Sequence, residues 1–415
     1  MGLVEIAGYY SNLKKGFMEL GYKSLFITKE KHKFDFGGDD NNCNIIVNAF
    51  SYFGFKRKSI PRKKFMAKGL FILLHWIFSI FTLCWAIFKF DVFIFGFGST
   101  FLGYKELPLL KMFGKKIIYV FHGSDTRPPY INGAYSNCES SELVKLSLRI
   151  KSILSKIERY ADHIICNPPQ AQLHERPFIS RMYVGSPIYI NKSNITKYDS
   201  KSIRIMHSPS DAKKKGTESI RDIMKNIKRM YPNINYIETS NLPNEIIIEE
   251  MIKSDIIIDQ LYSDFPMTGI AREAAFLGKP VVSGGYYAEE ISKDYSDSIP
   301  IYYCHPDKMK QAIIDLVESA DLREKVGRSA KEYINIHGAP VEVAKRYIQI
   351  ILGKAPRDWY YSPYDITYIK GCGFEENLLQ QTLSKLIMEE GIGSLQLSDK
   401  PQLEERFLEF IDGID

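Results

Sequence analysis

Short apolar runs alternate with longer amphipathic stretches through the first half of the chain. Several runs are β-branched or aromatic and apolar throughout, which is typical of strands buried on both faces of a parallel sheet. Between them lie stretches with helical periodicity; Leu143, Leu146, Ile150 and Leu154 share one face of a predicted helix. Strands are predicted at 3–7, 24–28, 45–47, 91–97, 116–121 and 162–166, and helices include 11–20 and 143–160.

A second alternating series follows a polar, aperiodic stretch at 189–202, which is typical of a linker. Two successive series predict an α/β protein with two Rossmann-like, doubly wound domains and right-handed crossovers. Ligands bind such sheets at the carboxyl ends of the strands, so the cleft between the facing domains is the expected site. The second series has predicted strands at 203–207, 234–239, 255–259, 280–283 and 300–304, and predicted helices at 219–230, 244–253, 269–277, 307–319 and 341–352.

The expected domains are 1–190 and 200–353, and a C-terminal extension occupies 354–415. The extension starts with an aromatic, turn-rich segment and continues into two predicted helices, 375–390 and 402–411. We expect it to pack on the second domain or to bridge back to the first, and association with another chain is an alternative. No chemistry is visible in it.

Composition changes this picture little. The chain has 415 residues, of which 45% are apolar and 25% charged, and these values are ordinary for a soluble globular protein. Its six cysteines are widely spaced without a CxxC pair, which argues against a disulfide framework and a zinc site and favours a reducing cytoplasm. The N-terminus lacks the pattern of a signal peptide.

One apolar stretch, 69–88, is long enough to span a bilayer, and His75 is its only ionisable residue. Only Lys89 and Phe90 separate it from a predicted buried strand, so we favour a crossover helix that is buried on one side. Its other face would rest on a membrane, helped by the basic cluster at 56–68; a fully buried helix is the alternative. By itself the basic cluster fits a solvated loop and a phosphate-attracting surface equally well.

The stretch 254–283 carries the strongest chemical signal. A buried strand ends at Asp259, and a helix begins near Thr268 and Gly269. Free backbone N–H groups at a helix start attract anions, Thr268 can cap the helix, and Gly269 permits close approach of a phosphate. Glu273, one turn inside, is placed to accept hydrogen bonds from ribose hydroxyls, although most helical glutamates have no such role.

A lysine-rich loop, 206–217, follows the first strand of the second domain. Lys213, Lys214 and Lys215 supply positive charge for a diphosphate, and Gly216 allows close approach. Charge alone favours an ordinary solvated loop.

A third group lies at a strand end in the first domain, where His122 and Asp125 are expected to face the cleft. Histidine there can donate a hydrogen bond or carry a proton near neutral pH, although a lone histidine is more often structural. The first βα turn adds Gly8, a weak feature; it is not a GxGxxG motif, so no NAD site is expected.

These motifs together resemble retaining GT-B glycosyltransferases of the family 4 type. The resemblance covers about residues 3–352 and is specific in three places. The residues that match the donor-binding helix and the turn after it are Glu273, Ala274, Gly278, Lys279, Pro280 and Val281, and the other matches are 122–125 and 215–217.

The resemblance implies roles for single residues. Glu273 would hold the ribose of a nucleotide, and His122 would contact the donor sugar. Lys215 and Gly216 match the family's basic turn. A usual Arg is replaced there by Ala212, and Lys213 or Lys214 is the candidate substitute.

The family's first Glu, near the donor sugar, is replaced here by Phe265. Asp264 is the candidate substitute, so His122, Asp125 and Asp264 form the candidate catalytic set. The donor-binding candidates are Gly8, Lys213, Lys215, Gly216, Thr268, Gly269, Ile270 and Glu273. No DxD-type pair is present, so no metal is expected, and Lys215 with the amides of 268–270 would stabilise the leaving diphosphate.

We therefore expect a metal-independent, hexosyltransferase-type glycosyltransferase without a cofactor, acting with retention in surface polysaccharide synthesis. The first domain would take a saccharide or lipid-linked saccharide acceptor, and the second the nucleotide-diphosphate sugar. We expect a cytoplasmic location at the inner face of the membrane, and no nucleic-acid partner. A GT-B sugar-nucleotide epimerase and a non-catalytic binding or assembly protein remain alternatives.

Overall fold

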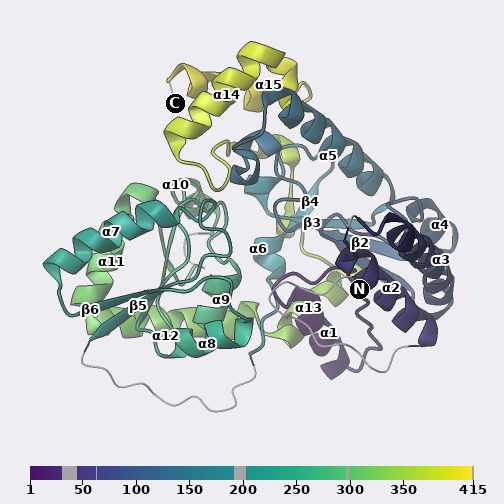
Figure 1. Ribbon diagram of the computed structural model, residues 1–415, viewed down its shortest axis with the longest axis horizontal. Coiled ribbons are helices and arrows are strands. Elements are labelled where there is room, and N and C mark those ends of the chain that lie inside the picture. Colours follow the sequence, from purple (N-terminus) through teal and green to yellow (C-terminus); the bar gives the residue numbers. More distant parts are fainter. Residues whose placement is uncertain (30–43, 62, 191–201, 296–298, 414–415) are drawn as a thin grey trace.

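The protein is described from a computed structural model that covers residues 1–29, 44–61, 63–190, 202–295 and 299–413, without the side chains of 292–295. Two α/β lobes stand side by side, and the last two helices lie above them near α5 (Figure 1). Most of the predicted linker, 191–201, lies outside the described residues.

The first lobe is built on a five-stranded sheet with the order β1-β2-β3-β4-β10. Strands β1 to β4 run parallel, and the short β10 from the C-terminal extension adds an antiparallel edge. The strands are β1 (Val92–Gly96), β2 (Lys116–Val120), β3 (His163–Cys166), β4 (Phe178–Ser180) and β10 (Tyr360–Tyr361), and the helices are α1 (Tyr9–Glu19), α2 (Ile45–Ser59), α3 (Phe65–Lys89), α4 (Leu107–Met112), α5 (Ser140–Tyr160) and α6 (Arg181–Val184).

The second lobe has a parallel five-stranded sheet with the order β6-β5-β7-β8-β9. Helices α7 and α11 pack on one face, and α8, α9 and α12 on the other. The strands are β5 (Ile203–His207), β6 (Ile234–Glu238), β7 (Ile256–Ile258), β8 (Val281–Gly284) and β9 (Tyr302–Cys304), and the helices are α7 (Thr217–Met230), α8 (Asn244–Ile252), α9 (Gly269–Phe276), α10 (Ala288–Tyr295), α11 (Met309–Glu318) and α12 (Ala320–His337). The expected fold class, two doubly wound parallel sheets, is confirmed.

Three strand predictions in the first lobe are wrong. Residues 45–47 begin helix α2, because Asn44 caps its first turn by accepting a hydrogen bond from Ile46 N at 3.1 Å. Residues 3–7 and 24–28 are not strands. Isolated hydrogen bonds hold this part of the chain: Ile27 N donates to Met1 O at 3.3 Å, and Gly2 N donates to Ile94 O of β1 at 2.7 Å.

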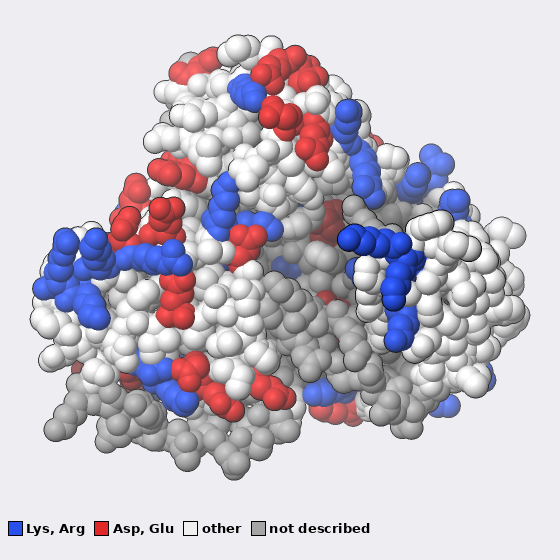
Figure 2. Space-filling model, viewed as in Figure 1, with Lys and Arg blue, Asp and Glu red and all other residues white. Residues whose placement is uncertain are grey.

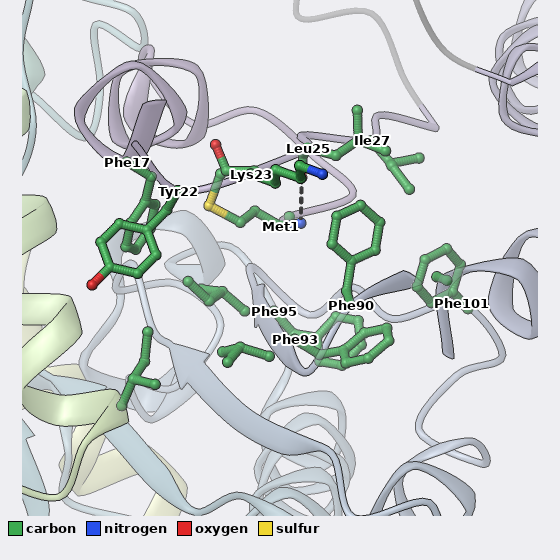
Figure 3. A pocket seen from close by; sticks show the side chains of 16 residues that line it. Met1, Phe17, Tyr22, Lys23, Leu25, Ile27, Phe90, Phe93, Phe95 and Phe101 are labelled. Atoms are coloured by element: carbon green, nitrogen blue, oxygen red, sulfur yellow. Dashed lines mark hydrogen bonds between the residues drawn. The ribbon is translucent and has the colours of Figure 1, made fainter. Parts of the chain in front are cut away.

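This loose N-terminal packing leaves an apolar cavity of ≈140 Å³ (Figure 3). Phe90, Phe93 and Phe95 line one side of it, and Met1 and Leu25 another. The Met1 amine donates to Leu25 O at 2.8 Å, and burial lowers its pKa to about 5.

Helix α13 (Pro340–Ile351) follows the second lobe in sequence but packs against α1 of the first lobe. The hydroxyls of Tyr9 and Tyr347 are 2.7 Å apart, and a Cβ at Gly16 would come within 2.0 Å of Pro340 O. This close helix contact therefore requires glycine at position 16. The domain limits stay a prediction, but the last helix of the predicted second domain belongs to the core of the first lobe.

The C-terminal extension contains α14 (Glu376–Glu390) and α15 (Pro401–Asp412), which share the first lobe's core with α5. The segment before α14 also contacts the second lobe. Cys372 N donates to Ile131 O at 3.1 Å, and Gly373 N donates to Tyr262 O at 2.8 Å. The extension therefore packs on the first lobe and bridges to the second.

Helices α2 and α3 form an antiparallel pair on the outside of the first lobe, and α3 is long and apolar enough to cross a membrane. Its single histidine points inward: His75 Nδ1 lies 3.1 Å from Phe50 O, and its ring stacks on that of Phe50. Only 33% of its most apolar window is buried, so a fully buried helix is the wrong alternative. The outward residues are Phe65, Met66, Leu70, Ile72, Leu73, Trp76, Ile77, Ile80, Phe81 and Phe88.

Candidate functional site

A cavity of ≈270 Å³ lies between the lobes at the carboxyl ends of β5 and β7. The first lobe contributes the turn before α1, and the second contributes the loops after β5 and β6, the start of α8 and the first turns of α9. The lining residues are Ile6, Ala7, Ser208, Pro209, Ser210, Lys215, Asn241, Leu242, Asn244, Ile247, Thr268, Gly269, Ile270 and Glu273. The structure thus brings together five of the predicted site residues, Lys215, Thr268, Gly269, Ile270 and Glu273.

Asp259, at the end of β7, organises the cationic side of this cavity. Its carboxylate is buried and accepts hydrogen bonds from Lys215 Nζ at 2.9 Å and Thr268 Oγ1 at 2.7 Å. Ser283 Oγ adds a third contact, at 3.4 Å. The carboxylate fixes the ammonium group of Lys215, which lines the cavity.

Thr268 does not cap helix α9 with its side chain, contrary to the prediction, because its hydroxyl donates to Asp259 instead. The first N–H groups of α9, those of Gly269 and Ile270, therefore begin a helix without a side-chain cap at the cavity wall. Uncapped helix starts carry partial positive charge and attract anions. A Cβ built at Gly269 would lie 3.5 Å from Ala7 Cβ, so α9 starts directly opposite the first-lobe turn.

Glu273 lies one turn further along α9 and is buried. Its Oε1 accepts a hydrogen bond from Asn244 Nδ2 at 2.9 Å. Burial raises the pKa of Glu273 to about 7, and the Asn244 contact and Arg272 only partly oppose this. Near its protonation midpoint, a carboxyl group is easily shifted to the ionised form. A ligand that donates hydrogen bonds to the carboxylate, as paired hydroxyls do, stabilises that form.

His122 lies at the carboxyl end of β2, and both of its ring nitrogens have neighbours. Nδ1 lies 3.3 Å from Arg181 Nη1, which donates, so the proton of a neutral ring sits on Nε2, 3.3 Å from Tyr10 OH. Burial, then Arg181 and Arg272, lower the pKa of His122 well below its ordinary value. The ring is therefore neutral at physiological pH and does not supply a proton as imidazolium.

Asp125 supports this turn. Its Oδ1 accepts from the His122 backbone N at 2.9 Å, and its buried Oδ2 has no hydrogen-bond partner among the residues that the structure describes. Burial raises the pKa of Asp125. The structure thus keeps His122 and Asp125 together, as predicted, but neither lines the large cavity.

Asp264, the third catalytic candidate, is held in an ion pair between the lobes. Its Oδ2 accepts from Arg127 Nε at 2.7 Å and also from Arg127 Nη2, and its Oδ1 accepts from Gln170 Nε2 at 3.1 Å. Both charged side chains are buried. With both oxygens occupied by first-lobe residues, Asp264 does not replace a sugar-binding Glu in this structure.

Three donor-binding candidates lie elsewhere. Lys213 is exposed and donates to Asn137 Oδ1 of the first lobe at 2.7 Å. Gly216 starts α7 at φ 66°, and a Cβ there would come within 2.8 Å of Leu261 Cβ, so it serves packing. Gly8 starts α1 at φ 74° without lining the cavity, whereas its neighbours Ile6 and Ala7 do line it.

Some lining and supporting residues carried no signal in the sequence. Asn244 and Asp259 hold Glu273 and Lys215, and Ser208 and Ser210 follow β5. The position of Asp259 at the end of a buried strand, opposite a lysine loop, could have indicated the ion pair. Asn244 lies on another helix and could not have been found by spacing.

Comparison with known proteins supports the fold. No protein-family model matches the chain, and no curated protein matches it. Sucrose-phosphate synthase from Thermosynechococcus elongatus has a similar structure, with a TM-score of 0.51 and 12% identity over 85% of this chain and 98% of that one. The chain has a GT-B fold.

Two solved structures from S. aureus also match with lower scores. TarM, in complex with UDP, fondaparinux and α-GlcNAc-glycerol, has a TM-score of 0.44 and 12% identity over 66% of this chain and 58% of that one. MnaA with UDP has a TM-score of 0.43 and 14% identity over 86% and 97%.

Proposed function

We propose that this GT-B protein is a glycosyltransferase that moves a sugar from a nucleotide-diphosphate donor to a saccharide or lipid-linked saccharide. One observation carries the proposal: Lys215, the uncapped start of α9 and the buried Glu273 line a single cavity between the lobes. The first two neutralise a pyrophosphate, and the third accepts hydrogen bonds from ribose hydroxyls.

The reaction proposed is hexosyl transfer with retention and without a metal ion, in surface polysaccharide synthesis. Lys215 and the Gly269 and Ile270 amides stabilise the negative charge that develops on the leaving diphosphate. The leaving phosphate takes the acceptor proton, and closure of the lobes excludes water.

Binding of the donor is tested first. A thermal-shift screen of nucleoside diphosphates identifies the base, since a ligand at 100 times its Kd adds about 2.7 kcal/mol of stability. Lys215→Ala and Glu273→Ala are expected to weaken that nucleotide roughly tenfold or more, because each removes a hydrogen bond to a charged group. Lys213→Ala, which alters an exposed lysine of the same loop, is the matched control and keeps the wild-type affinity.

Turnover is tested next, with the matching sugar nucleotide and a panel of acceptors in buffer that contains EDTA. Product formation that falls in both cavity variants and persists in Lys213→Ala supports transfer. Nucleotide binding without any product supports the non-catalytic alternative, which the ion pair of Asp264 with Arg127 favours. Conversion of the sugar nucleotide itself, without acceptor, would show an epimerase.

The proposal includes contact with the cytoplasmic face of an anionic membrane through α2 and α3. Figure 2 shows a broad uncharged area over this side of the first lobe, bordered by Lys and Arg side chains. The apolar outward face of α3 fits the lipid interface, and the exposed Lys56, Lys58, Lys63 and Lys64 at the connection fit anionic headgroups. Occupation of that face by lipid would bring a lipid-linked acceptor to the first lobe.

Co-sedimentation with vesicles tests this contact. Binding to phosphatidylglycerol vesicles, weaker with phosphatidylcholine and in high salt, is expected for the wild type. Trp76→Ser/Phe81→Ser should abolish it, while Met388→Ser, an exposed apolar residue on α14, should leave it intact. Equal binding by both variants would contradict the membrane contact.

A further inference from the structure

A second cavity lies between the lobes and shares no lining residue with the large one. It measures ≈20 Å³ and is lined from the first lobe by Arg181, at the start of α6, and from the second lobe by Arg272 of α9. Both arginines are more than nine-tenths buried. Phe265, the residue found where the resemblance leads one to expect a Glu, also lines it.

Within the described residues each guanidinium is only partly satisfied. Arg181 Nη1 donates to Phe121 O at 3.1 Å and to His122 Nδ1 at 3.3 Å, but its Nε is buried without a partner. Arg272 Nε donates to Thr268 O at 3.3 Å, and its buried Nη1 has no partner. Among the described residues neither arginine forms an ion pair, and the Phe265 ring centroid lies 4.9 Å from Arg181 Cζ.

Two buried cations without a counter-ion are unfavourable. Arginine does not escape by losing its proton, so a buried guanidinium ordinarily has an acidic partner. Burial and then the neighbouring Arg181 lower the pKa of Arg272 to about 10, and both arginines contribute to keeping His122 neutral. Asp125 acts on Arg181 and Glu273 acts on Arg272 through space, but among the described residues neither carboxylate forms an ion pair with an arginine of this cavity.

We propose that Arg181 and Arg272 together bind one oxyanion, a carboxylate or phosphate group on the substrate, at a site separate from the pyrophosphate cavity. Two guanidiniums that line one cavity suit an oxyanion with two or more acceptor oxygens. The cavity has room for about one water-sized group, so a single oxygen of the anion enters it and a sugar ring does not. The identity of the ligand as a substrate group rests on the proposed function.

Inorganic phosphate is the first probe, titrated by calorimetry at constant ionic strength. Arg181→Gln and Arg272→Gln are each expected to weaken phosphate roughly tenfold or more, since each removes a hydrogen bond to a charged group. Arg272→Lys keeps the positive charge but loses the paired N–H donors of the guanidinium. Its phosphate affinity should lie between those of the wild type and Arg272→Gln. Lys213→Gln is the control and should match the wild type.

Competition separates this site from the large cavity. With the nucleoside diphosphate from the screen bound at saturation, phosphate should still bind with unchanged affinity. Displacement of phosphate by the nucleotide, loss of phosphate binding in Lys215→Gln alone, or equal binding by all variants would each overturn the proposal. If no nucleoside diphosphate binds but the arginine variants lose phosphate, the proposed function fails and the anion site stands.

The source of the anion follows from a second competition. UDP-glucuronate that displaces phosphate where UDP-glucose does not assigns the site to a carboxylate on the donor sugar. Phosphate that is displaced by glycerol 3-phosphate, and not by glycerol, assigns it to a phosphorylated acceptor. Both results support the site, and failure of every anionic probe to displace phosphate contradicts its assignment to substrate.

Discussion

Two groups of buried charges cross the gap between the lobes, and they differ in whether their partners are present. Arg127 donates to one oxygen of Asp264 and Gln170 donates to the other, so both oxygens of that carboxylate have partners within the chain. Arg181 and Arg272 are buried to a similar degree, but in the described part of the chain neither forms an ion pair. The first group joins the lobes. The second is the proposed binding site for an oxyanion from outside the chain.

The largest expected effect comes from breaking the satisfied group. Asp264→Ala leaves Arg127 buried and unpaired, which should lower the free energy of unfolding by about 3–5 kcal/mol in urea denaturation. Glu324→Ala, which breaks an exposed pair with Arg328, should cost less than about 1 kcal/mol. A loss for Asp264→Ala no larger than for Glu324→Ala would show that the lobes do not depend on this ion pair.

A smaller effect concerns Glu273, the buried carboxyl group next to Arg272 on α9. Its pKa is raised by burial to about 7, so between about pH 4.5 and 7 the unfolded carboxyl has lost its proton while the folded one keeps it. Stability of the unliganded protein should therefore fall as pH rises through this window, by about 2–3 kcal/mol.

The nucleotide should show the opposite trend, because hydroxyl donors favour the ionised carboxylate. Its affinity is expected to rise up to tenfold per pH unit below pH 7 and to level off above it. Calorimetry from pH 6 to 8 measures this, and Glu273→Gln should flatten both profiles. A wild-type profile that is already flat would show that Glu273 does not titrate in this range.

The smallest expected effect distinguishes the paired Arg127 from the arginines of the second cavity most directly. In anion-free buffer Arg272→Gln removes one of two like charges, so its unfolding free energy should stay within about 1 kcal/mol of wild type or rise. Added phosphate should stabilise the wild type only. If Arg272→Gln lowered the free energy of unfolding by several kcal/mol, Arg272 would have a structural role like that of Arg127.

Sequence patterns predicted the second lobe well because its strands are runs such as Ile256–Ile258, apolar on both faces and bounded by polar residues. The run at 45–47 looked the same but begins a helix, since a short apolar run does not distinguish strand from helix without its flanks. Asn44 was the available signal, because its side chain caps that helix.

The site residues also differ in how well the sequence predicts them. Lys215 and the 268–273 segment converge because the carboxyl ends of parallel strands meet at one edge of a sheet. Asp264 depends on how the lobes dock, and Arg181 depends on how distant parts of the first lobe fold together. Their partners Arg127 and His122 lie 137 and 59 residues away in sequence, and no periodicity encodes such distances.

Helix α13 has a practical consequence for anyone who would produce the second lobe by itself. Its apolar side, with Val343, Ala344, Tyr347 and Ile350, is covered by α1, α6 and the first sheet. A fragment that ends at 353 would carry this bare surface into solution and should aggregate. A fragment that ends at Gly338 lacks α13 and should stay soluble, so a solubility measurement distinguishes the two fragments.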